Sequence, residues 1–163
     1  MQLSDIQKLY AYNDWSNERL LHSVEALTEE QYTRPIVSSY PSIRDTVSHI
    51  ASSEWIWLRR WLGESPASIP ESFAAPAFEE ARASLRTTAA ERKAWLASLT
   101  GIDGTVHYRS IKGDSFTMQL EDVLVHCANH STYHRGQLVT MLRQAGGSVA
   151  NTDYSAFIRS ITV

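Results

Sequence analysis

One long helical stripe that carries histidines constrains this chain more than any other feature. His130 and His134 lie one turn apart in the middle of the stripe, when residues 120–142 are read at 3.6 residues per turn. One histidine on an apolar face is most simply hydrogen-bonded to a neighbour. Two that point the same way can instead share a divalent ion, as in HExxH zinc sites. The full stripe is Val123, Cys127, His130, His134, Leu138 and Met141.

Helix geometry limits which histidines can act together. His126 lies slightly off the stripe, and its eight-residue separation from His134 is about 12 Å along a helix axis. Both cannot bind one ion through bonds of about 2.1 Å. The pair is therefore His126 with His130 or His130 with His134, and the second pair is better centred. Ser131 replaces the glutamate of an HExxH protease, so a third ligand must come from another segment.

Three further segments show apolar stripes at helical spacing: residues 4–27, 42–62 and 77–99. With the histidine stripe they predict an all-α, four-helix bundle, in which sites are built from side chains on facing helices. Alternating residues around a Lys-Gly-Asp turn in residues 104–117 predict a short β-hairpin before the last long helix. We expect a single domain over residues 1–163.

Capping residues indicate where the helices start. Ser4 with Gln7, and Ser42 with Asp45, have the spacing of a capping box. We expect the last long helix to begin near Thr117. The tail, residues 153–161, has weak helical periodicity and is expected to fold back over one end of the bundle.

Four polar residues fall on the predicted apolar stripes. Asn13 and Asn17 lie midway along the first, where they either bond to a neighbouring helix or line a pocket. Glu54 lies near the centre of the second, where an unpaired carboxylate is costly. It would pair with a buried arginine or accept a hydrogen bond from a metal-bound histidine. His49, toward one edge of that stripe, is the leading candidate for the third ligand.

Composition narrows the class of protein. The net charge of −3 gives no reason to expect nucleic-acid binding. No apolar run approaches the ~20 residues of a membrane helix, and residues 1–10 do not resemble a signal peptide. The single cysteine, Cys127, fits a reducing compartment and is most simply a small core residue. We therefore expect a cytoplasmic protein that binds neither nucleic acid nor membranes.

Three groups of residues together resemble the DinB-like (DinB/YfiT) family of metal-dependent enzymes. They are Tyr10 with Trp15-x-Asn17, the run SIRDTV-x-HI at residues 42–50 with Glu54, and His126-x-x-Asn129 followed by HSTYHRGQ at residues 130–137. The resemblance covers nearly the whole chain, and its most specific part is the string NHSTYHRGQ.

The resemblance implies a fold and a ligand set. The fold is an up-down-down-up bundle, and a divalent metal, commonly nickel or zinc, is held by His49, His130 and His134. His126 is then a neighbour of the site. Many members are dimers, and some are S-transferases that use low-molecular-weight thiols such as bacillithiol or mycothiol.

Two classes of function follow from a three-histidine site. Three imidazoles leave positions open for water or substrate, and the ion would lower the pKa of bound water to about 7 or activate a thiolate. The first class is a thiol S-transferase or hydrolase acting on a small molecule, with Asn13, Asn17 and Glu54 contacting the pocket or a ligand histidine. The tail around Asp153 and Tyr154 would gate that pocket. The second class is a non-catalytic metal- or ligand-binding bundle with a stress-related role.

Apolar residues outside the core stripe of the second helix, together with the family resemblance, predict a homodimer. Trp55, Ile56 and Leu62 place apolar surface off that stripe, and such surface is usually covered by another element or subunit. Light scattering at high micromolar concentration is expected to give twice the mass of one chain. A monomer would contradict this prediction, and residues 63–76 would then have to cover the surplus surface.

Overall fold

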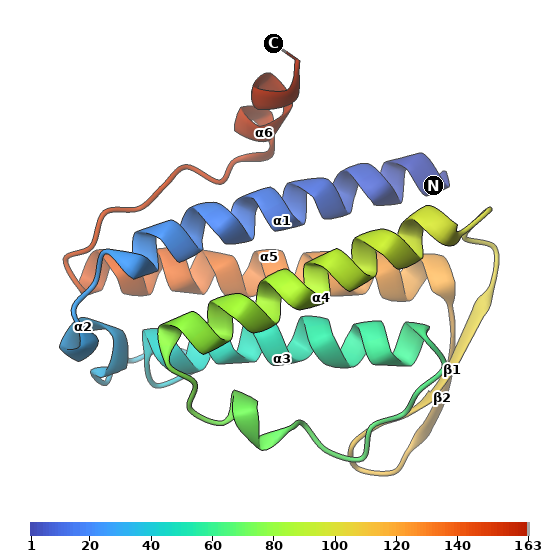
Figure 1. The fold of residues 1–163 in the computed structure, drawn as a ribbon, viewed down its shortest axis with the longest axis horizontal. Helices are drawn as coiled ribbons and strands as arrows, with labels where there is room; N and C mark the ends of the chain where they lie inside the picture. Colours follow the sequence, from blue (N-terminus) through green and yellow to red (C-terminus); the bar gives the residue numbers. More distant parts are fainter. Residues whose placement is uncertain (163) are drawn as a thin grey trace.

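Four long amphipathic helices pack side by side in the computed structural model, which describes residues 1–162 (Figure 1). They are α1 (Leu3–Glu25), α3 (Ile43–Trp61), α4 (Phe78–Ser98) and α5 (Leu120–Gln144). The four-helix bundle predicted from the stripes is confirmed. The shorter elements are α2 (Glu29–Thr33), the 3-10 turn η1 (Glu71–Phe73), β1 (Thr105–Arg109), β2 (Ser115–Gln119) and α6 (Tyr154–Ile161). The prediction of one domain over residues 1–163 stays a prediction, and residue 163 lies outside the described residues.

The helix directions follow the expected up-down-down-up order. In Figure 1, α1 and α5 run one way and α3 and α4 run the other. Helix α3 contacts α4 and α5, and α1 contacts the same two helices from the opposite corner. Each helix therefore has one parallel and one antiparallel neighbour. The parallel pair α3–α4 requires a long return connection, which η1 and its flanking residues provide along the bundle.

The ends of the helices follow capping chemistry, with one change from expectation. Ser42 caps α3 and accepts a hydrogen bond from the backbone N–H of Asp45, as predicted. Helix α1 instead begins at Leu3, because the Asp5 carboxylate accepts the backbone N–H of Gln2. The capping box expected at Ser4 was therefore wrong, and that residue lies inside the first turn.

The predicted β-hairpin is present at one end of the bundle. Strands β1 and β2 pair antiparallel, and Gly113 in the turn has φ of +95°, a conformation that favours glycine. The expectation that the last long helix begins near Thr117 was wrong, because Thr117 lies within β2. The strand runs directly into α5, whose first residue, Leu120, donates its N–H to the carbonyl of Gly104.

The tail packs on α1 rather than over one end of the bundle. The ring of Phe157 is buried 5.7 Å from the rings of Tyr12 and Trp15. The Tyr12 hydroxyl also donates to the carbonyl of Thr152. Figure 1 shows α6 beside α1 on the outside of the bundle, so the expected position over one end is corrected.

The core consists of two apolar clusters with a polar layer between them. One cluster surrounds Leu20, Val47 and Leu138, and the other surrounds Trp61 and Leu124. Buried polar side chains from all four long helices occupy the level between the two clusters. Within the described residues, no helix is both long and apolar enough to cross a membrane.

The residues behind the dimer prediction are mostly covered within the chain. Ile56 is buried, and the ring of Trp55 packs 5.9 Å from the ring of Phe73 in the connection between α3 and α4. Leu62 remains 42% exposed. The connecting segment therefore covers much of the surface assigned to a second subunit, and the homodimer stays a prediction based on the family resemblance.

Candidate metal centre

Three imidazoles meet between α3 and α5. Nε2 of His49 lies 3.1 Å from Nε2 of His134 and 3.4 Å from Nε2 of His130. The nitrogens of His130 and His134 are 3.2 Å apart. Nitrogens that share an ion through bonds of about 2.1 Å lie about 3.0–3.4 Å apart, from right-angled to tetrahedral geometry. Among residues 1–162, these histidines form the one group of three ligand-type side chains that could hold an ion.

The cluster lies at the edge of the α3–α5 interface rather than in the core. His134 is buried, but His49 and His130 are only half-buried. Ser131 and Arg135 occupy the positions on α5 that face the bundle interior. The sequence-based expectation of two histidines in the middle of the stripe is therefore corrected. An edge position leaves the cluster reachable from solvent.

One hydrogen-bond chain sets the tautomer of His134. Its Nδ1 lies 2.8 Å from the side-chain oxygen of Gln137, which accepts only when Nδ1 carries the proton. The amide nitrogen of Gln137 donates in turn to the Ser39 hydroxyl at 2.7 Å. Because Nδ1 holds the proton of the neutral ring, Nε2 presents a lone pair to the cluster.

Hydrogen bonds alone cannot satisfy the three facing nitrogens. Each nitrogen of a neutral imidazole is either a donor or an acceptor, so three mutually adjacent nitrogens always include one like pair. Such a pair brings two hydrogens or two lone pairs together. A cation removes this conflict, because all three nitrogens can then present lone pairs to it. The arrangement therefore fits a metal ion better than a hydrogen-bonded cluster.

The electrostatics keep the imidazoles neutral. Burial lowers the pKa of His49 and of His130 to about 4 each, and the nearby His134 adds to both shifts. Burial also lowers the pKa of His134, against the opposing effect of its bond to Gln137. Neutral imidazole is the form that binds metals.

Two tyrosines flank the cluster. The ring of Tyr40 stacks on His49 with centroids 4.3 Å apart, and its edge contacts His134 at 5.6 Å. Tyr133 is 61% exposed and lies edge-on to His134 at 5.0 Å. Aromatic rings from two segments therefore border the cluster. Tyr40 comes from the segment before α3, and Tyr133 comes from α5.

His126 and Cys127 lie outside the cluster. The exposed ring of His126 packs edge-on against Trp57 at 5.1 Å and lies 5.9 Å from the ring of His130. Cys127 is fully buried, and burial raises the pKa of its thiol to about 12. A thiol that stays protonated is a poor nucleophile, so Cys127 acts as a core residue.

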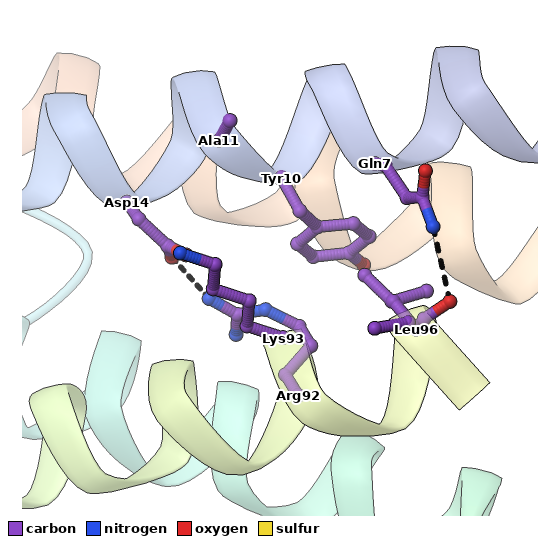
Figure 2. A pocket seen from close by; sticks show the side chains of 8 residues that line it. Gln7, Tyr10, Ala11, Asp14, Arg92, Lys93 and Leu96 are labelled. Carbon is purple, nitrogen blue, oxygen red and sulfur yellow. Dashed lines mark hydrogen bonds and ion pairs between the residues drawn. The ribbon is translucent and has the colours of Figure 1, made fainter.

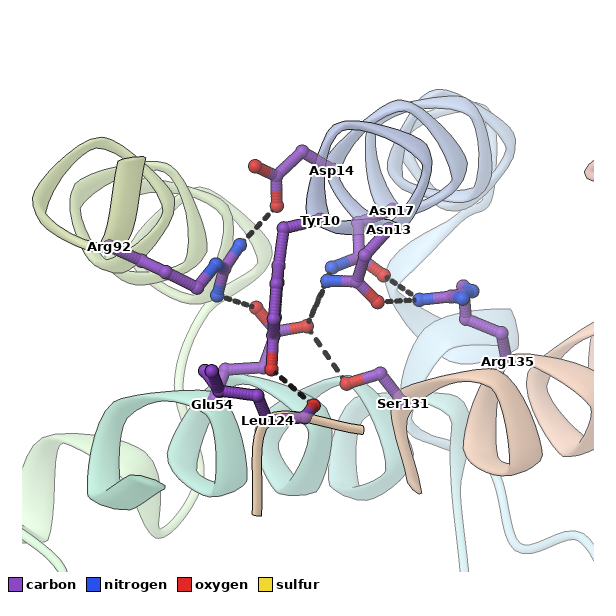
Figure 3. Close-up of polar contacts among 9 residues, drawn as sticks. All are labelled: Tyr10, Asn13, Asp14, Asn17, Glu54, Arg92, Leu124, Ser131 and Arg135. Carbon is purple, nitrogen blue, oxygen red and sulfur yellow. Dashed lines mark hydrogen bonds and ion pairs between the residues drawn. The ribbon is translucent and has the colours of Figure 1, made fainter. Parts of the chain in front are cut away.

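A buried polar network contains the other three predicted site residues (Figure 3). It lies near the imidazoles, because Ser131 of the network directly follows His130 on α5. The Oε1 atom of Glu54 accepts hydrogen bonds from Asn13, Asn17 and Ser131, each at 2.9 Å. Its Oε2 atom accepts from Arg92 at 2.7 Å. Burial opposes ionisation of Glu54, but these donors outweigh it and hold the carboxyl pKa well below its ordinary value.

The network decides between the alternatives for Glu54 and gives both asparagines partners on neighbouring helices. Within residues 1–162, Glu54 forms no hydrogen bond with His49, His130 or His134, so it is the salt-bridge partner of a buried arginine. Asn13 and Asn17 bond to neighbouring helices rather than to the cluster. The expectation that these three residues contact a ligand histidine is corrected to a supporting role in the core, whereas Asn17 also lines a small cavity of about 110 Å³ between α1 and α4.

Sequence reasoning missed two arginines of this network. Arg92 is fully buried between Glu54 and Asp14, and Arg135 donates to the side-chain oxygens of Asn13 and Asn17. The sequence pattern of α4 could have indicated that Arg92 is buried. Arg92 continues a helical stripe of buried residues on α4, and a charged residue on such a stripe predicts a buried counter-ion. The other members of that stripe are Ala81, Leu85, Thr88 and Leu96.

One hollow near the network opens on another side of the bundle. A cavity of about 530 Å³ lies between α1 and α4, with the Asp14–Arg92 ion pair at one end (Figure 2). A hydrogen bond from Gln7 to the Leu96 carbonyl closes the other end. None of the three clustered histidines lines this cavity. The cavity and the imidazole cluster are therefore separate features.

Fold and cluster define an up-down-down-up four-helix bundle that presents three histidines from two antiparallel helices. Residues 1–162 match the family model described as the DinB family, and the chain belongs to that family. It is 28% identical over 158 residues to Protein DinB of Bacillus subtilis strain 168. That match covers 93% of this chain and 92% of the relative.

Two solved structures share the fold. A DinB-like protein from Bacillus cereus ATCC 10987 superposes with a TM-score of 0.70 at 18% identity, over 92% of this chain and 97% of that one. YfiT from Bacillus subtilis, described as a probable metal-dependent hydrolase with an unusual four-helix bundle topology, gives 0.69 at 19% identity. That match covers 88% of this chain and 89% of YfiT.

Loss of Arg92 should strongly destabilise the fold. Arg92→Met removes the cation bonded to buried Glu54 and half-buried Asp14, and leaving a buried charge uncompensated costs about 3–5 kcal/mol. Urea unfolding monitored by circular dichroism measures the change. Lys93→Met, at the next and exposed position of α4, is the control and should shift stability by less than about 0.5 kcal/mol. Equal effects of the two substitutions would refute a special role for Arg92.

Proposed function

We propose that this chain is a divalent-metal-dependent enzyme whose ligands are His49, His130 and His134. The observation that carries the proposal is the mutual 3.1–3.4 Å spacing of the three Nε2 atoms. The like-pair conflict among these nitrogens and the proton position set by Gln137 both favour a bound cation. Imidazole ligands suit nickel and zinc, and we propose one of these as the metal.

Three protein ligands leave coordination positions open, as in catalytic rather than structural zinc sites. A bound ion would supply Lewis acidity and lower the pKa of a coordinated water. The chain supplies the remaining functions. Gln137 fixes the ring of His134, Tyr40 covers one face of His49, and the half-buried edge position admits a small molecule. The substrate we propose is accordingly a small molecule rather than nucleic acid or a membrane lipid.

Hydrolysis is the reaction class we propose first. YfiT, which has the same fold, is described as a probable metal-dependent hydrolase. The alternative reaction is the transfer of a low-molecular-weight thiol by an S-transferase, as the family resemblance implies. The only cysteine is buried and protonated, so such a transferase would need a low-molecular-weight thiol as a co-substrate. Cysteine usage and the family resemblance support a cytoplasmic homodimer as part of the same proposal.

Metal analysis tests the ligand set. After loading with nickel or zinc and gel filtration, the wild-type protein should retain about one ion per chain. His130→Ala and His134→Ala should each lose it, because two imidazoles hold an ion far more weakly than three. His126→Ala is the matched control on the same helix and should retain the ion. Full retention of the ion by His130→Ala or His134→Ala would contradict the proposed ligand set.

Activity panels separate the two reaction classes. A hydrolase should turn over activated esters or amides without added thiol, whereas a transferase should consume a low-molecular-weight thiol together with an electrophile. Either activity should disappear in His134→Ala. If the metal-loaded protein turns over nothing and its cobalt-substituted form admits no added ligand, the non-catalytic binding bundle with a stress-related role replaces the enzyme.

A further inference from the structure

We propose that Ser53 is a positioning residue of the metal centre, whose hydroxyl holds the molecule that occupies the open side of the ion. The inference rests on the proposed function, since it concerns the ligand that the three histidines leave room for. At the contact point, that molecule carries an oxygen or an anionic atom that accepts a hydrogen bond from the hydroxyl.

The position of Ser53 is the first observation. It lies one helical turn after His49 on α3, and its Oγ atom is 3.4 Å from Nε2 of His49. This distance equals the separation of the His49 and His130 nitrogens. The hydroxyl therefore borders the group of three nitrogens at its His49 corner. Tyr40 stacks on His49 from the segment before α3, so Ser53 approaches from the other direction along the helix.

Neighbouring serines of α3 show that this orientation is specific. Ser48 donates its hydroxyl to the carbonyl of Phe73, and Ser52 donates to the carbonyl of His49 at 3.2 Å. Both hydroxyls are thus engaged by backbone carbonyls, and the bond of Ser52 to the preceding turn is the usual arrangement for serine in a helix. Within the described residues, the Ser53 hydroxyl has no carbonyl partner, and its one hydrogen-bond contact is Nε2 of His49.

Metal binding would remove that single contact. Once Nε2 of His49 gives its lone pair to an ion, it can neither accept from nor donate to Ser53. Ser53 is half-buried, and leaving a partly buried polar group without a partner costs free energy. We take the new partner to be the molecule that occupies the open side of the ion, because the hydroxyl borders the three nitrogens. A hydroxyl is not among the usual protein ligands of such ions, so the role is positioning rather than ligation.

Azide binding to the cobalt-substituted protein tests this role without measuring activity. Visible absorption follows azide entering the open side, in the wild type and in Ser53→Ala, Ser53→Thr and Ser52→Ala. Loss of one hydrogen bond to an anion should raise the azide Kd of Ser53→Ala about tenfold. Ser53→Thr keeps the hydroxyl and should restore most of the affinity. Ser52→Ala, the matched control, should bind azide like the wild type.

The cobalt content of the same samples shows which proposal has failed, the three-histidine metal site or the positioning role of Ser53. Ser53→Ala should keep the wild-type cobalt content, since Ser53 is not a ligand. Unchanged azide affinity in Ser53→Ala, or an equal loss in Ser52→Ala, would overturn the role of Ser53 alone. Loss of cobalt from Ser53→Ala would overturn positioning in favour of ligation. A wild-type protein that binds no cobalt would overturn the proposed function and this inference with it.

Discussion

The hydrogen bonds and the ion pair of the buried Glu54 carboxylate hold the four long helices in place. Its two oxygens accept hydrogen bonds from α1, α4 and α5, so all four long helices meet at one charge of α3. Removing a carboxylate from water costs several kcal/mol unless its partners are in place. Apolar surfaces can shift past one another at small cost, whereas this set of donors cannot. The polar layer therefore fixes how the helices are aligned along the bundle.

The geometry of the imidazole cluster follows from the same alignment. Ser131, which donates to Glu54, directly follows His130 on α5, and Glu54 lies little more than one turn after His49 on α3. The bond between Ser131 and Glu54 thus sets the offset of α5 against α3 at the level of the histidines. Two sets of contacts therefore fix the proposed metal centre. The Glu54 network aligns the two helices, and the hydrogen bond between Gln137 and His134 fixes one imidazole ring.

Local patterns predicted the helices well, because periodicity and capping act over a few residues. The stripes gave the four long helices, the Lys-Gly-Asp turn gave the hairpin, and Ser42 marked the start of α3. The partner of Glu54 could not be chosen in the same way. A salt bridge and a contact with a ligand histidine produce the same sequence pattern, because both require only a carboxylate on an apolar helix face. Arg92 was missed because a lone charged residue usually lies on the surface.

Helical spacing and the family resemblance were enough to predict the all-α bundle and to identify His49, His130 and His134 as the candidate cluster. The position of that cluster in the bundle, and the residues around it, depend on how the helices pack. The histidines lie at the edge of the α3–α5 interface, and Glu54 pairs with Arg92 instead of an imidazole. The physical reason is that helical spacing defines which residues share a face. The facing residue on another helix depends on how distant segments align, and here buried charges set that alignment.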